Sequence, residues 1–275
     1  MAGGVQMLID AHIHLDEPAY RHLAGVIRRA RGDGVACAVA VGSGADSNAR
    51  VLRLARDHPD FVWPCLGLHP ERAGTEADLR EVAAQVCRHR DAIVGIGEVG
   101  LPYYSLREVQ DPVAFQRAGE ARLRVLADLA AELDLALVLH APREAAGAAL
   151  ATLRAAGVGR AMFHWHKAAP DVTAAICAAG YCVSVTPEVC YRERDRDLVR
   201  AVPRDRLLIE TDGPWPFRGP FEEKATEPAM LPRVAAEVAS LWGCPLAEAG
   251  AQLTATAEAV FGRRAPRPAG TAKAF

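Results

Sequence analysis

Several features that would point to a membrane or secreted protein are missing from this sequence of 275 residues. No run approaches the roughly 18 consecutive apolar residues that a membrane-spanning helix requires. The first residues contain no basic segment of the kind that begins a secretory signal. The seven cysteines are scattered without a Cys-x-x-Cys pair, which is typical of reduced thiols rather than of a disulfide framework. We therefore expect a cytoplasmic protein that makes no membrane contact.

The charge balance lacks the excess of basic residues that general attraction to nucleic acid requires. The formal net charge is −2 at pH 7, whereas duplex-binding proteins usually carry a basic domain or stripe. A local basic patch around a site is compatible with this balance. The apolar fraction of 51% is ample for one large core.

Short apolar runs rich in β-branched residues alternate with segments of helical periodicity along the chain. In the segment 112–133, for example, Phe115, Leu123 and Leu126 recur at spacings that share one helical face. The apolar runs predict eight strands, at residues 7–11, 36–41, 61–66, 92–97, 136–139, 161–163, 181–185 and 207–210.

Eight successive β-then-α units predict a parallel sheet that closes into a barrel. The expected fold class is therefore α/β, a single-domain (β/α)8 TIM barrel over residues 1–262, because such barrels commonly have about 250 residues. An open, doubly wound sheet is the alternative, but no Gly-x-Gly-x-x-Gly turn follows the first strand. Residues 263–275 are rich in Pro, Arg, Ala and Gly and are expected to form a disordered tail.

Side chains that bind metals recur where the predicted strands end, and in barrel enzymes the catalytic groups come from these ends. His12 and His14 are two residues apart, so on an extended chain they point to the same side. Imidazoles or carboxylates also follow strands 4, 5, 6 and 8, namely Glu98, His140, His164 and Asp212. A lone histidine at a strand end is more often a hydrogen-bonded core residue. Burying four imidazoles and two carboxylates together without metal, however, would leave polar groups poorly paired.

The number and type of these ligands predict a centre with two metal ions. Six nitrogen and oxygen ligands are too many for one tetrahedral site, but they suit two divalent ions that share a bridging carboxylate. Imidazole combined with carboxylate suits Zn, Mn, Fe or Co, and Mg is compatible with an oxygen-rich side. We therefore expect two divalent ions, with Zn, Mn and Mg as the main candidates.

An ordered set of motifs resembles the TatD family of metal-dependent deoxyribonucleases, within the wider amidohydrolase-like barrels. The matching stretches are Ile9–Asp16, Gly67–Pro70, Ile96–Leu101, Val138–His140, Phe163–His164 and Leu208–Pro214. Individually these motifs are weak, but their order is specific, and the resemblance extends from about residue 7 to residue 262.

The resemblance implies a role for each matched position. It implies that one metal is held by His12, His14 and Asp212, the other by His140 and His164, with Glu98 as the bridge between them. His69 is similar to the family's Gly-x-His-Pro histidine, which makes it a candidate substrate contact. A hydrogen bond that orders the loop is the alternative role of His69.

Three departures from the family pattern bear on the substrate. Pro102 stands where family members often have Asp, and Thr256 stands where they usually have Asn. His166 lies in the run His-Trp-His-Lys-Ala, where the family usually has His-Cys-Phe-Ser-Gly. The ligand set is intact, so the departures concern which substrate is hydrolysed.

The predicted reaction is hydrolysis of a phosphodiester bond by a water that two metal ions activate, with single-stranded DNA, DNA ends or a small phosphodiester as substrate. Asp212 is expected to accept the proton of that water. The predicted catalytic residues are therefore Asp212, as the proton acceptor, and Glu98, as the bridge between the metals. Arg143 and Lys167 lie within three residues of a predicted ligand and are expected to contact phosphate.

Aromatic residues after the strands add candidate contacts to bases. Tyr103 and Trp215 are expected to stack on splayed bases, with ordinary loop packing as the alternative. Together with His69, Arg143 and Lys167, they form the predicted substrate-binding set.

Two other functions use the same sequence features. An amide, ester or lactone hydrolase with two metals, including an aminoacyl-tRNA deacylase, would need the same ligands, and the near-neutral charge suits it. Barrels of the phosphotriesterase type often bridge their metals with a modified Lys, whereas this chain has Glu98 at that position, which favours phosphodiesters. A catalytically silent barrel that serves as a binding partner would have no need of six ligands.

Overall fold

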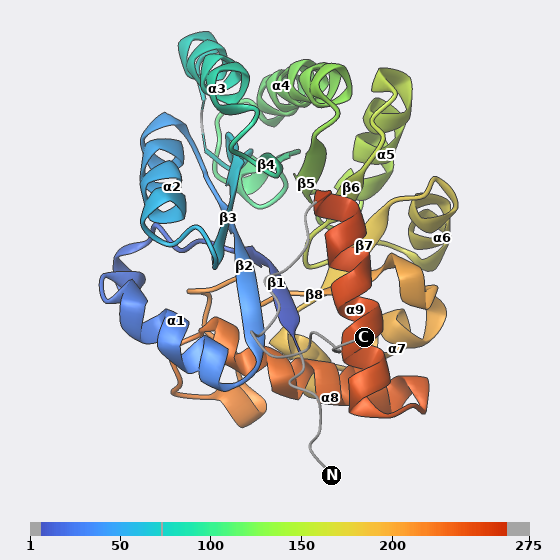
Figure 1. Ribbon diagram of the computed structural model, residues 1–275. Helices are drawn as coiled ribbons and strands as arrows, with labels where there is room; N and C mark the ends of the chain where they lie inside the picture. Colours follow the sequence, from blue (N-terminus) through green and yellow to red (C-terminus); the bar gives the residue numbers. More distant parts are fainter. Residues whose placement is uncertain (1–6, 73, 263–275) are drawn as a thin grey trace, which may run out of the picture.

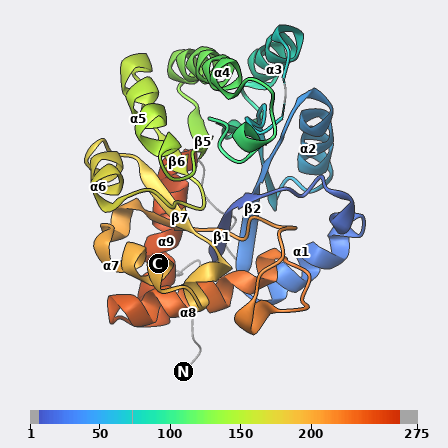
Figure 2. The ribbon, with the colours of Figure 1, turned by 180° about the vertical axis from the view of Figure 1, so that it is seen from behind.

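The computed structural model describes residues 7–72 and 74–262, and eight parallel strands follow one another around a barrel in it (Figures 1 and 2). The strands are β1 (Leu8–Ile13), β2 (Val35–Val41), β3 (Val62–Leu66), β4 (Gly95–Gly100), β5 (Ala136–His140), β6 (Ala161–Phe163), β7 (Cys182–Val185) and β8 (Leu207–Ile209). Each strand pairs in parallel with the next one. Just beyond β8, the amide of Asp212 donates to the His12 carbonyl (3.0 Å) and closes the barrel against β1. The predicted (β/α)8 barrel is confirmed.

Helices cover the outside of the strands (Figure 1). They are α1 (Leu23–Gly32), α2 (Ala45–Asp57), α3 (Glu76–His89), α4 (Pro112–Leu133), α5 (Ala145–Ala156), α6 (Pro170–Ala178), α7 (Glu193–Ala201) and α8 (Leu231–Trp242). Local sequence sets where helices begin. Thr75 and Asp78 form a capping box before α3, and Asp111 caps α4 ahead of Pro112. None of the helices in the described ranges is both long and apolar enough to cross a membrane.

The fourth strand lies three residues later than the predicted segment 92–97. The amides of Ala92 and Ile93 still donate to the His89 carbonyl, so this part of the chain belongs to the turn that ends α3. The later start carries β4 on to Gly100 and places Glu98 within the strand. The predicted tail at residues 263–275 lies outside the described residues.

One end of the barrel is sealed by a helix that follows the eight β/α units, α9 (Leu246–Phe261). Its residues Ala257, Val260 and Phe261 pack into the apolar cluster that fills the barrel interior. The ring of Phe261 lies 6.4 Å from that of Trp63 on β3, measured between centroids. Figure 1 shows α9 crossing this end of the barrel. The open end of the barrel is therefore the other one, where the strands have their carboxyl termini.

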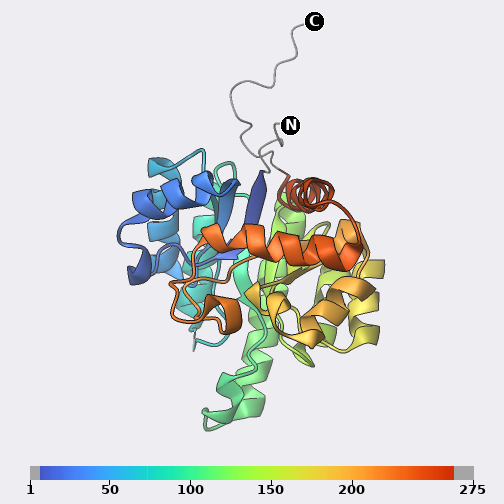
Figure 3. The same ribbon diagram turned by 90° about the horizontal axis from the view of Figure 1, so that it is seen from below.

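The connection from β4 to α4 enlarges this other end. It contains a single 3-10 turn, Ser105–Arg107, and leads into the exposed first turn of α4. In Figure 3 this green segment projects from the body of the molecule on the side away from α9. It therefore stands beside the mouth of the barrel.

Close backbone packing between β3 and β4 fixes the position of Glu98. A Cβ atom at Gly67 would stand 2.4 Å from the backbone nitrogen and oxygen of Glu98. The amide of Glu98 in turn donates to the carbonyl of Gly42 (2.9 Å) after β2. Three neighbouring chain segments thus touch at the carboxyl ends of their strands, with no room for a side chain at Gly67.

Gly67→Ala is expected to lower the free energy of unfolding by about 1–3 kcal/mol, because an overpacked backbone contact cannot be relieved by a change of rotamer. Gly147→Ala is the matched control. Gly147 lies within α5, a Cβ there meets nothing within 4 Å, and alanine should stabilise the helix by roughly 0.5–1 kcal/mol. Urea denaturation of both variants measures the difference. A free energy of unfolding for Gly67→Ala equal to or above that of the wild type would contradict the close packing at Glu98.

Candidate metal centre

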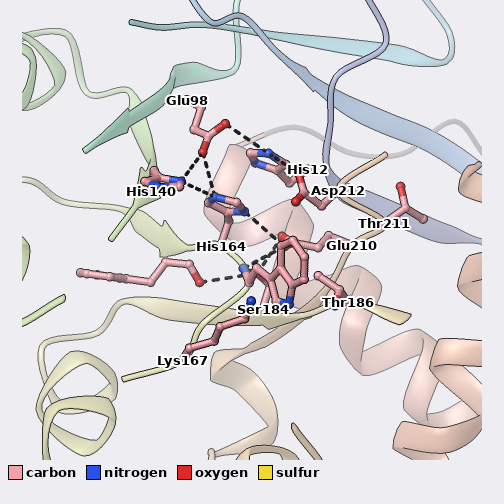
Figure 4. A network of polar contacts seen from close by, with 12 residues as sticks. His12, Glu98, His140, His164, Lys167, Ser184, Thr186, Glu210, Thr211 and Asp212 are labelled. Carbon is pink, nitrogen blue, oxygen red and sulfur yellow. Dashed lines mark hydrogen bonds and ion pairs between the residues drawn. The ribbon is translucent and has the colours of Figure 1, made fainter. Parts of the chain in front are cut away.

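The six side chains predicted as metal ligands converge at the open end of the barrel. His12, Glu98 and His140 belong to β1, β4 and β5, and the remaining three follow strand ends, namely His14, His164 and Asp212. Figure 4 shows Glu98 between His12 on one side and His140 and His164 on the other. The convergence follows from topology, because neighbouring parallel strands all end at one rim.

One carboxylate oxygen of Glu98 faces the first group of donors. Glu98 Oε2 lies 3.2 Å from His14 Nε2 and 3.6 Å from His12 Nε2. Asp212 Oδ1 lies 3.3 Å from His12 Nε2 and 3.7 Å from His14 Nε2. Ligands at about 2.1 Å from a tetrahedral zinc ion stand roughly 3.4 Å from one another. These four atoms therefore have the spacing of a metal-ligand set.

The other oxygen of Glu98 faces a second group of donors. Glu98 Oε1 lies 2.8 Å from His140 Nδ1, 2.9 Å from His164 Nε2 and 3.2 Å from His69 Nε2. His140 Nδ1 and His164 Nε2 are 3.3 Å apart. His69, predicted as a substrate contact, thus stands with the predicted ligands. Its Nδ1 also accepts a hydrogen bond from the backbone amide of Glu71 (3.2 Å), so it orders the loop as well.

Unpaired buried atoms show that these residues fit a metal. His12 Nε2 and Glu98 Oε2 are buried and have no hydrogen-bond partner among the residues that the structure describes. Buried polar atoms without partners are costly, and a cation between the two would satisfy both. Imidazole nitrogen and carboxylate oxygen are the ligands that Zn, Mn and similar divalent ions take.

The surroundings of the two carboxylates at the centre keep both of them ionised. Burial would raise the pKa of Glu98, but the imidazoles of His69 and His164 outweigh burial and hold this pKa well below its usual value. The His12 imidazole beside Asp212 likewise outweighs burial and lowers the pKa of that carboxyl. Burial lowers the pKa of His12, which favours the neutral imidazole that can ligate. Two ionised carboxylates thus stand beside a neutral imidazole.

Two further carboxylates beside the centre escape prediction from the sequence, Glu210 and Glu71. Glu210 is fully buried, and its Oε1 lies 3.4 Å from His164 Nδ1. Glu71 Oε1 lies 3.0 Å from His140 Nε2. A carboxylate that is hydrogen-bonded to the second nitrogen of a histidine ligand fixes its tautomer and orientation, and Glu71 is placed to do this for His140. Glu210 could have been found from its position two residues before Asp212. Glu71 lies on a loop after β3 and has no comparable signal.

A cavity of about 820 Å³ opens over the centre. Three of the predicted substrate contacts line it, namely His69, Lys167 and Trp215, and so does Tyr104, the neighbour of the predicted Tyr103. Lys167 Nζ lies 3.6 Å from the centroid of the Trp165 ring. It also lies 3.9 Å from Glu188 Oε2. The exposed fraction is 49% for Tyr104 and 56% for Trp215, so both rings are open to a ligand.

Two of the predicted substrate contacts stand apart from the cavity wall. Tyr103 packs beside Tyr104, with ring centroids 5.2 Å apart, and Tyr104 is the one that lines the cavity. Arg143 is exposed on the loop after β5 and is not among the described residues that line the cavity. The structure therefore does not place the Arg143 side chain on the cavity wall.

The chain matches a known protein family over nearly its whole length. Residues 9–262 match the family described as TatD-related DNases. The chain belongs to this family. A 3'-5' ssDNA/RNA exonuclease TatD from Erwinia tasmaniensis is 33% identical over 250 residues, which cover 86% of this chain and 92% of the relative. The uncharacterized metal-dependent hydrolase YabD from Bacillus subtilis is 30% identical, with 93% of this chain and 99% of the relative covered.

A solved structure of a TatD homolog has the same fold. The crystal structure of YJJV from Escherichia coli superposes with a TM-score of 0.85 at 24% identity, and covers 94% of this chain and 99% of its own. Together with the family match, this confirms the prediction of a metal-dependent hydrolase of the TatD type.

The three departures from the TatD pattern have structural explanations away from the cavity wall. Buried His166 pairs through Nε2 with Thr173 Oγ1 (2.8 Å). Buried Thr256 donates to the Gln252 carbonyl (3.0 Å) within α9. Pro102 packs against Gly119 of α4, where a Cβ would meet its Cδ at 2.5 Å. None of the three is among the described residues that line the cavity.

Proposed function

We propose that this TatD-family hydrolase cleaves phosphodiester bonds of single-stranded nucleic acid at a centre of two divalent metal ions. One observation carries the proposal: the buried carboxylate of Glu98 presents one oxygen to each of two donor groups. This is the arrangement of a bridging ligand, and two ions that share a carboxylate are typical of enzymes that break phosphate esters. The relative from Erwinia tasmaniensis, named a 3'-5' ssDNA/RNA exonuclease, supports the nucleic-acid substrate.

Each ion would be held by one oxygen of Glu98 and three side chains of its own. The first set is His12, His14 and Asp212, and the second is His140, His164 and His69. This imidazole-rich set suits Zn or Mn better than Mg. When bound, the ions would polarise the scissile phosphate and lower the pKa of a bound water molecule.

Asp212 is placed to move the proton that hydrolysis releases. The pKa of its carboxyl is lowered and the residue lines the cavity, while Oδ1 faces His12 and His14. The backbone at Asp212 is left-handed (φ 47°), a conformation that Asp tolerates better than most residues. The carboxylate can therefore hold an ion with one oxygen and accept a proton from the attacking water with the other.

The cavity walls favour single strands over duplex. Tyr104 follows β4 and Trp215 follows β8, and these strands are opposite one another in an eight-stranded barrel. Two exposed rings from different connections of the barrel thus line the cavity over the centre, where bases next to the scissile phosphate could stack. Bases in a duplex are already stacked and paired, so they are not free to do so. Lys167 supplies a positive charge for the phosphate between them.

Lys167→Ala is expected to raise KM for a single-stranded oligonucleotide roughly tenfold or more, because a charge-assisted hydrogen bond contributes about 1.5–3 kcal/mol. Steady-state kinetics on a labelled oligonucleotide measure the change. Lys224→Ala is the matched control, since Lys224 lies exposed in the β8–α8 connection and its Nζ donates to the Pro220 carbonyl. An unchanged KM for Lys167→Ala would contradict the phosphate contact.

The function itself is tested by metal analysis of the purified protein together with a chelator-controlled cleavage assay. The substrates are single-stranded DNA and RNA oligonucleotides, the same sequences as duplexes, and a panel of esters and aminoacyl-tRNA. We expect cleavage of the single strands, its loss in chelator and its recovery when Mn²⁺ or Zn²⁺ is returned. Hydrolysis confined to the esters or to aminoacyl-tRNA would overturn the proposal.

A further inference from the structure

The carboxylate of Glu71 joins two parts of the site. Glu71 Oε1 accepts hydrogen bonds from the amides of Tyr103 (2.9 Å) and Tyr104 (3.0 Å). Glu71 Oε2 accepts from the amide (2.8 Å) and the hydroxyl (2.6 Å) of Ser105. Glu71 Oε1 also lies 3.0 Å from His140 Nε2. A side chain from the β3–α3 connection therefore ties the β4–α4 connection to a histidine at the end of β5.

The position of Glu71 selects one tautomer of His140. The other ring nitrogen, Nδ1, lies 2.8 Å from Glu98 Oε1 and 3.3 Å from His164 Nε2, inside the second donor group. A neutral imidazole carries one proton. With that proton on Nε2, donated to Glu71, the lone pair of Nδ1 faces the donor group. The opposite tautomer would place an N–H there, where no metal ion could be bound.

The same carboxylate orders a wall of the cavity. It binds three consecutive amides, so the chain from Tyr103 to Ser105 curls around one anion. This places the Tyr104 ring on the cavity wall, with its centroid 6.1 Å from that of His140. The orientation of His140 and the position of this wall therefore depend on one group.

We propose that Glu71 is a positioning residue for the metal centre. It holds His140 with Nδ1 toward the second ion and holds the Tyr103–Ser105 segment as a wall of the cavity. The inference rests on the proposed role of His140 as a metal ligand. It assigns Glu71 no contact with the substrate or with the ions.

The test compares Glu71→Gln and Glu71→Ala with the wild type, each as the full chain. Metal-depleted protein is titrated with Zn²⁺ in competition with a chelator. We expect the affinity of the second ion to fall by roughly 10–100-fold in both variants, since loss of a carboxylate partner of a histidine ligand has this effect, while the first ion binds as before. Glu71→Gln keeps the size and one acceptor oxygen, and it carries the test should Glu71→Ala not fold.

A second readout follows the cavity wall without metal or substrate. Hydrogen exchange at the amides of Tyr103, Tyr104 and Ser105 is expected to accelerate at least tenfold in Glu71→Ala. Asp78→Asn is the matched control. The Asp78 carboxylate accepts hydrogen bonds from the amide and the hydroxyl of Thr75 in the capping box of α3, in the same part of the chain. Asp78→Asn should leave both the Zn²⁺ affinity and this exchange unchanged.

The outcomes separate failure of the inference from failure of the ligand assignment. One outcome is that His140→Ala loses the second ion while both Glu71 variants bind it with wild-type affinity. The positioning role is then wrong, even if hydrogen exchange at Tyr103–Ser105 is faster in Glu71→Ala. If His140→Ala also keeps both ions at wild-type affinity, the assignment of His140 as a ligand is wrong and the inference falls with it. Neither result depends on cleavage of nucleic acid, which tests the proposed function separately.

Discussion

Glu98→Ala is expected to leave the protein unable to hold two divalent ions and to lower the rate of hydrolysis on the order of 10³-fold or more. Glu98 is the group that reaches both donor sets. Its Oε1 lies within 3.2 Å of three imidazole nitrogens, and its Oε2 lies 3.2 Å from His14 Nε2. In the proposed centre, removing Glu98 would take one ligand from each ion at once. Stabilisation of the reacting phosphate by the ions is worth several kcal/mol, and each 1.4 kcal/mol corresponds to a factor of ten in rate.

Metal analysis and single-turnover cleavage of an oligonucleotide measure this effect together. Glu98→Gln is the informative companion, because it keeps the shape and one carbonyl oxygen but loses the second ligand oxygen and the charge. We expect it to bind one ion and to remain far below wild-type activity. Glu222→Ala, an exposed carboxylate near the rim, serves as the control and should keep both ions. Two tightly bound ions in Glu98→Ala would show that Glu98 is not the bridge.

The convergence of the ligands was predictable from the sequence because it depends on topology and on the period of a strand. In a (β/α)8 barrel the strand order follows the chain order, so residues that follow successive strands meet at one rim. Within a strand, residues two apart point to the same side, which is why His12 and His14 could be placed together. Glu210 and Asp212 lie beyond β8, and the backbone at Asp212 is left-handed (φ 47°), so the same rule does not place these two side chains.

The positions of the loop side chains could not be predicted in this way, because loops lack the regular alternation of side chains that a strand has. Tyr103 and Tyr104 are neighbours of the same type, and only the folded structure shows that Tyr104 is the one that lines the cavity. Arg143 follows β5 by three residues, but its backbone is left-handed (φ 54°). Its side chain is exposed and does not line the cavity. Glu71 lies two residues after His69, and only the fold shows that it reaches His140.

Asp212→Asn is expected to lower kcat by about 10²–10⁴-fold, the range that general acid–base groups contribute. The amide keeps an oxygen that can face His12 and His14, so the first ion should still bind at raised metal concentration. The amide cannot accept a proton at neutral pH, so the attacking water loses its acceptor. Asp205→Asn, an exposed carboxylate just before β8, is the control and should leave kcat unchanged.

The two roles of Asp212 are separated by measuring kcat as a function of Mn²⁺ concentration, with the number of bound ions determined at each point. A ligand role alone predicts that saturating Mn²⁺ restores kcat of Asp212→Asn to the wild-type level, because the weakened site is filled by mass action. A proton-accepting role predicts that the deficit persists with two ions bound, since filling the site supplies no base. The position of Asp212, with Oδ1 toward His12 and His14 and the residue on the cavity wall, favours the persistent deficit. Full recovery would reduce Asp212 to a ligand and leave the proton acceptor to be sought among the other cavity residues.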